Sequence, residues 1–125
     1  MIARSLAGAL FVVTCAGCSP AARHVAGPFY LIERPESREL ALYRCPDGPP
    51  GCAIDELPVL NVLAAGGNDH FVAVQSDRGY YYLRRIAQER SGWGNNPEKI
   101  VGPLSEADFT ASRRRLGLPD LDIRP

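Results

Sequence analysis

The chain has 125 residues with 14 basic and 14 acidic side chains, so its formal net charge is zero. This length suits one small domain with its own hydrophobic core. The balanced charge argues against nucleic acid as a partner, because nucleic-acid-binding domains present a basic face, and it gives no reason to expect strong steering of a charged substrate.

The first 17 residues have the pattern of a secretory signal peptide. One basic residue, Arg4, precedes the apolar run LAGALFVVT at residues 6–14, and small residues follow. This combination is typical of exported proteins. The run is shorter than the about 20 apolar residues of a membrane-spanning helix, and a buried N-terminal helix is the remaining alternative. We expect residues 1–17 to be removed on export.

The tripeptide AGC at residues 16–18 resembles the end of a bacterial lipobox, whose cysteine receives lipid. Cys15 departs from this pattern, because an aliphatic residue is usual there. The segment VVTC at residues 12–15 is a second candidate, but its threonine suits the position before the cleaved bond less well. We therefore predict lipidation of Cys18 and attachment to a membrane, because two or more acyl chains hold a protein firmly on a bilayer.

A serine follows Cys18, a pattern that resembles lipoproteins sent to the outer membrane. The predicted location is the cell envelope, on the periplasmic face of the outer membrane if the source has two membranes. Residues 18–27 are small and lack an apolar period, which indicates a tether. The folded domain is expected at residues 28–125.

Cys45 and Cys52 remain in the expected mature chain and bracket the sequence PDGPPG, which consists of turn residues. A close cysteine pair in an exported protein predicts a disulfide. The alternative is a redox or metal-binding pair. The spacing is too long for a C-x-x-C motif, and no second Cys or His pair completes a zinc site.

Short apolar runs separated by turns predict strands at residues 29–34, 39–44, 59–65, 70–75 and 80–87. The run at 59–65 could also form a short helix, but the turn sequence GGND that follows it favours a strand. The run at 70–75 is apolar on both faces, which predicts a central position. Short turns between the last three runs predict an antiparallel meander, and residues 99–101 could form a further short strand.

A C-terminal helix is the clearest local signal. Ser105 is an N-cap with Asp108 as the capping-box acid, and the basic residues 113–115 complement the negative end of the helix dipole. Gly117 ends the helix. A helix of about 12 residues is marginal alone in water, so it must dock on the sheet.

Phe109 and Leu116 share one face of this helix and should contact the sheet. The sequence therefore predicts an α+β fold, in which a small antiparallel β-sheet with meander topology carries one docked C-terminal helix.

Several motifs together resemble a family of small exported bacterial proteins that has no assigned activity. They are GPFYL at 27–31, GNDHF leading into a strand with Ala and Gln at 67–75, three tyrosines at 80–82, GPLSE-x-x-F at 102–109 and Leu-Gly at 116–117. The resemblance spans residues 27–118 and implies export and a shared fold, but no site residues. The cysteine loop departs from the family pattern.

The residues that could take part in catalysis are better explained by their places in the expected fold. Asp69 and His70 are neighbours, but adjacent strand residues point to opposite faces, so we expect a turn residue and an exposed strand start. The acids Glu33, Glu36 and Glu39 are interpreted as a solvated sheet edge rather than as a carboxylate pair for sugar hydrolysis. We predict no catalytic residues, no metal site and no cofactor.

Two further features could contact partners. Residues 113–115 (RRR) could meet anionic lipid headgroups, but helix-end capping is the favoured interpretation because it needs only local electrostatics. Trp93 stands in the glycine-rich sequence SGWGNN, where it could anchor a partner or fold back over the sheet.

These observations favour a non-enzymatic binding or accessory lipoprotein that contacts an envelope protein. The alternative is a periplasmic inhibitor of a lysozyme-like cell-wall hydrolase, with the loop at 88–97 or at 46–51 entering the active-site cleft. A small enzyme ranks last, because no nucleophile and base can be named.

Overall fold

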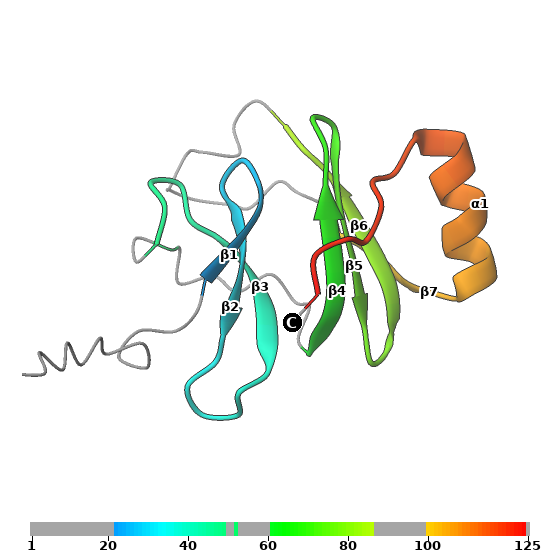
Figure 1. Cartoon of the computed structure of the whole chain (residues 1–125). Helices are drawn as coiled ribbons and strands as arrows, with labels where there is room; N and C mark the ends of the chain where they lie inside the picture. The colour runs from blue at the N-terminus through cyan, green and yellow to red at the C-terminus, as the bar shows by residue number, and fades with distance from the viewer. Residues whose placement is uncertain (1–21, 50–51, 53–60, 87–99, 125) are drawn as a thin grey trace, which may run out of the picture.

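The computed structural model describes residues 22–49, 52, 61–86 and 100–124. Within these ranges the chain forms two antiparallel sheets and one helix, stacked as three layers (Figure 1). The first sheet contains β1 (Ala22–Ala26), β2 (Phe29–Glu33) and β3 (Leu40–Arg44), in this order. The second contains β4 (Val62–Gly67), β5 (Phe71–Ser76), β6 (Gly79–Arg84) and β7 (Val101–Leu104), in this order.

The helix α1 (Glu106–Leu116) covers the face of the second sheet that lies away from the first (Figure 1). The predicted α+β fold with an antiparallel meander and a docked C-terminal helix is therefore confirmed. The strands divide between two sheets, which the sequence did not indicate.

The predicted tether at residues 18–27 is wrong for residues 22–26. These residues form β1, which pairs with β2, and Val25 and Ala26 are buried. The sequence ARHVA is too short and too polar at its start to show a strand period. It is held as a strand because the turn at Gly27, with φ of 51°, folds it back onto β2.

The second sheet has a core on each face, which explains why β5 is apolar on both sides. Val72 and Val74 join the cluster between the two sheets, whereas Phe71 and Ala73 join the cluster under α1. Successive strand residues point to opposite faces, so one strand supplies both cores. β5 pairs with β4 and β6, which confirms its predicted central position.

The helix has the predicted caps and docks as expected. The Ser105 hydroxyl accepts a hydrogen bond from the Asp108 backbone N–H at 3.1 Å, and Gly117 takes the left-handed conformation with φ of 74°. Phe109 is buried, and its ring stacks on Tyr80 with centroids 4.7 Å apart. Leu116 packs beside it in the same cluster.

After α1 the chain crosses the second sheet and covers the edge of β4. Ile123 forms an antiparallel bridge with Ala65, with both N–H···O distances at 2.8 Å. The closest approach occurs at Gly66, where a Cβ atom would overlap the Asp120 carbonyl. The bridge satisfies backbone groups of β4 that would otherwise be exposed at a sheet edge.

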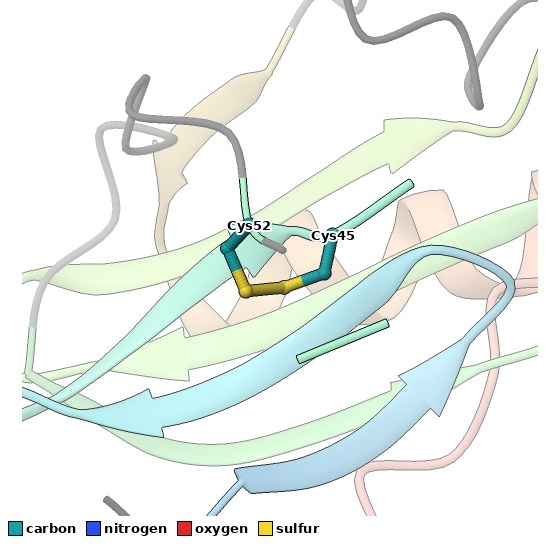
Figure 2. Close-up of a disulfide and its surroundings, with 2 residues drawn as sticks. All are labelled: Cys45 and Cys52. Carbon is teal, nitrogen blue, oxygen red and sulfur yellow. A yellow bond between two sulfur atoms is a disulfide. The ribbon is translucent and has the colours of Figure 1, made fainter. Parts of the chain in front are cut away.

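A disulfide joins Cys45 and Cys52 with an S–S distance of 2.05 Å, as the sequence predicts (Figure 2). Cys45 directly follows β3 and is buried, and its N–H donates to the Pro28 carbonyl at 2.6 Å. The hydrogen bond holds the start of the loop against the β1–β2 turn, and the disulfide joins Cys52 to that point.

Removal of this disulfide should lower the free energy of unfolding by about 2.5 kcal/mol, the chain-entropy value for a loop of about eight residues. Cys52→Ser is the suitable variant because Cys52 is less buried than Cys45. Urea unfolding would measure the change relative to the oxidised wild type, and the reduced wild-type protein is the control that should match the variant. Equal stability of the variant and the oxidised wild type would contradict this prediction.

Several predicted features lie outside the described residues: the signal peptide, Cys18, Trp93 and the loop at 88–97. Among the residues that the structure does describe, no helix has the length and apolar character required to cross a membrane.

Candidate functional site

A basic pocket of about 470 Å³ lies where the β4–β5 turn, the end of β6 and the end of α1 meet. Its described lining residues are His70, Phe71, Arg84, Arg85, Arg115 and Leu116. We call this feature the basic pocket. Three arginines, one histidine and two apolar residues therefore contribute to it.

Pairing of β5 with β6 brings the first two arginines to the pocket. Phe71 and Arg84 are cross-strand partners, and the Arg84 guanidinium carbon lies 5.6 Å from the centre of the Phe71 ring. A cation over an aromatic face is attracted by the ring quadrupole. Arg85 continues the chain beside His70, and its backbone N–H donates to the His70 carbonyl at 2.8 Å.

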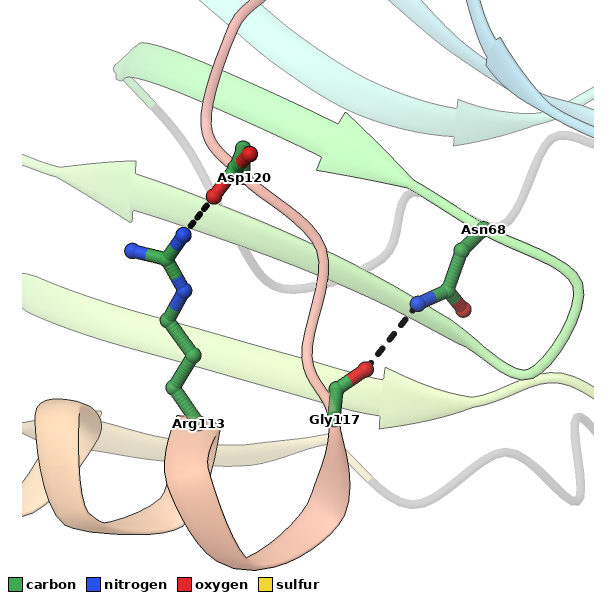
Figure 3. Close-up of polar contacts among 4 residues, drawn as sticks. All are labelled: Asn68, Arg113, Gly117 and Asp120. Atoms are coloured by element: carbon green, nitrogen blue, oxygen red, sulfur yellow. Dashed lines mark hydrogen bonds and ion pairs between the residues drawn. The ribbon is translucent and has the colours of Figure 1, made fainter.

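Asn68 organises this corner of the molecule. Its side-chain oxygen accepts from the N–H groups of His70 and Phe71 at 2.9 and 2.8 Å, and thereby shapes the β4–β5 turn. Its side-chain nitrogen donates to the Gly117 carbonyl at 3.0 Å (Figure 3). Its backbone carbonyl accepts from Arg85 at 2.9 Å. One residue therefore connects the turn, the helix end and a pocket arginine.

The helix end is fixed by a second contact on its other side. Arg113 forms an ion pair with Asp120, in the segment that crosses the second sheet (Figure 3). Residues 113–115 lie in the last turn of α1, as helix-end capping requires. Arg115, two residues after Arg113, also lines the basic pocket.

The described lining residues carry charge of one sign, since they include three arginines and no carboxylate. Arginine presents its N–H donors in a planar fork that matches the oxygen atoms of phosphate and carboxylate groups. The arrangement can therefore bind an anion, and the half-buried Leu116 can contact an attached apolar group.

The acidic and histidine residues considered for catalysis lie at or beside two different turns of the fold. Asp69 and His70 are exposed at the turn, as expected, and only His70 borders the pocket. Glu36 is exposed in the turn between β2 and β3. Glu33 and Glu39 are half-buried, and Glu33 lies in β2, the central strand of its sheet, so the predicted solvated edge is wrong for these two acids. Over the described ranges, no three His, Cys, Asp or Glu side chains gather as a metal site would require.

Sequence reasoning does not identify three residues at this pocket: Asn68, Arg84 and Arg85. The available signals were the adjacent arginines that end the tyrosine-rich strand and the asparagine in the preceding turn. Their meeting depends on the register of β5 against β6 and on the docking position of α1.

Comparison of the chain with protein-family models, with curated proteins and with solved structures found no match in any of the three.

Proposed function

We propose that this protein is a lipid-anchored, non-enzymatic binding module of the cell envelope. The observation that carries the binding role is the convergence of Arg84, from β6, and Arg115, from α1, onto one pocket. A concave site with a few convergent polar groups and apolar walls is the usual form of a ligand site.

The chemistry of the pocket favours binding over catalysis. Guanidinium groups keep their proton near neutral pH, so they hold anions but do not act as general bases. Export and anchoring are supported by the signal-peptide pattern and the AGC tripeptide at residues 16–18. The disulfide between Cys45 and Cys52 fits an oxidising compartment.

Native mass spectrometry of the protein extracted from its own envelope would test this function. We expect a non-covalent adduct, either a small ligand or a protein, on the wild type. The adduct should be lost from a variant that combines Arg84→Gln with Arg115→Gln. Arg114→Gln is the matched control, because Arg114 is exposed on the same helix and does not line the pocket.

A wild-type protein without any adduct would refute the proposed binding role. The same adduct on the double variant would also contradict it, because the ligand would then bind away from the basic pocket.

A further inference from the structure

We propose that the basic pocket binds the phosphate group of a phosphate ester, with the apolar part of the ester lying against Leu116. This proposal rests on the proposed binding function and specifies the chemical class of the ligand. Its premises are the charge of the pocket, the way its arginines are held, its apolar wall and its place in the fold.

The charge of the pocket matches phosphate better than carboxylate. A phosphate monoester carries about −1.5 to −2 charges at pH 7 and presents three acceptor oxygens, whereas a carboxylate carries one charge and two oxygens. Arg84 and Arg115 line the pocket from two different elements. A guanidinium can donate two parallel hydrogen bonds to such a group, so a dianion with three oxygens matches two arginines better than a carboxylate does.

Defined contacts position Arg84 and the helix end that carries Arg115. Arg84 lies over the Phe71 ring, and Asn68 fixes the end of α1 through the Gly117 carbonyl. Groups that are already positioned lose less conformational entropy when a ligand binds. Two positive charges therefore border the pocket on two fixed elements.

The pocket also has room and an apolar wall for more than inorganic phosphate. Its volume of about 470 Å³ lies within the range of roughly 300–1,000 Å³ that small-molecule sites occupy. Leu116 is half-buried and packs against the cluster under α1, and it forms the apolar side of the lining. An organic substituent on the phosphate would contact it, whereas the Phe71 ring is buried and covered by Arg84.

The place of the pocket in the fold favours a soluble ester over a headgroup of the anchoring membrane. Figure 1 shows that α1 and the start of β1 lie on opposite sides of the two-sheet core. If Cys18 carries the anchor, the chain between it and Ala22 reaches at most about 14 Å at full extension. The β1 side is then held near that membrane, and the pocket lies on the helix side.

Titration calorimetry on the mature protein in detergent, in a buffer free of phosphate, would test this. The probes are phenyl phosphate, benzoate and dihexanoyl phosphatidic acid. We expect phenyl phosphate to bind about tenfold more tightly than benzoate, a difference of about 1.4 kcal/mol. Arg84→Gln and Arg115→Gln should each weaken phenyl phosphate about tenfold, whereas Arg114→Gln should leave its affinity unchanged.

Both pocket variants change exposed side chains, so their unfolding midpoints should match the wild type. Equal affinity for benzoate, no binding of phenyl phosphate, or unchanged binding in both variants would overturn the proposal. Competition by dihexanoyl phosphatidic acid would support a lipid headgroup as the source of the phosphate, and its failure to compete would support a soluble ester. If an envelope adduct is found but phenyl phosphate does not bind, the binding function stands and the phosphate assignment falls.

Discussion

Phe109→Ala should destabilise the protein by about 3 to 5 kcal/mol, the usual cost of truncating a buried aromatic side chain. Phe109 is 4% exposed and is the residue of α1 that is fully buried against the second sheet. Its loss removes the stacking on Tyr80 and opens a cavity in the cluster under α1. A helix of 11 residues is not stable alone in water, so α1 should detach before the sheets unfold.

Urea unfolding followed by far-ultraviolet circular dichroism would measure this change. Thr110→Ala is the matched control, because Thr110 is the next residue and is exposed, and such surface changes usually stay within about 0.5 kcal/mol. Phe109→Ala should also abolish phenyl phosphate binding, since Arg115 is carried by the same helix. A Phe109→Ala protein as stable as Thr110→Ala would show that the helix does not depend on this contact.

Gly66→Ala should destabilise the protein by about 3 kcal/mol, near the upper end of the usual cost of overpacking. An added Cβ would overlap the backbone carbonyl of Asp120, and backbone cannot move aside as a flexible side chain can. Relief requires the C-terminal segment to lift from the sheet and the bridge between Ala65 and Ile123 to break.

Gly117→Ala provides the comparison, because a Cβ at that position would meet no atom within 4 Å. Its cost arises from the left-handed backbone alone, with φ of 74°, and should be about 1 kcal/mol. Thermal unfolding would show which of the two variants loses more stability relative to the wild type. A smaller loss for Gly66→Ala than for Gly117→Ala would mean that the C-terminal segment does not press on β4 as described.

Local signals in the sequence were sufficient for the elements that depend on local interactions. The helix could be placed because Ser105, Asp108 and Gly117 make contacts within a few residues of themselves. The disulfide could be predicted because Cys45 and Cys52 are separated by turn residues only. The central position of β5 could be predicted because two apolar faces require two neighbouring layers.

Features that depend on distant segments could not be predicted in the same way. β1 has no apolar period of its own and exists because it pairs with β2. The predicted strands are compatible with one sheet. Their division into two sheets depends on the packing of the core between them, which involves residues distant in the sequence. The basic pocket combines residues from the β4–β5 turn, β6 and α1, and only tertiary packing brings Arg84 and Arg115 together.

The intact mass of the protein extracted from its own membranes tests the anchored location most directly. The predicted species lacks residues 1–17, carries a glyceryl group and three acyl chains on Cys18, and has lost two hydrogens through the bond between Cys45 and Cys52. A mass that corresponds to an unmodified Cys18, or to a chain that retains residues 1–17, would contradict the proposed lipid anchor.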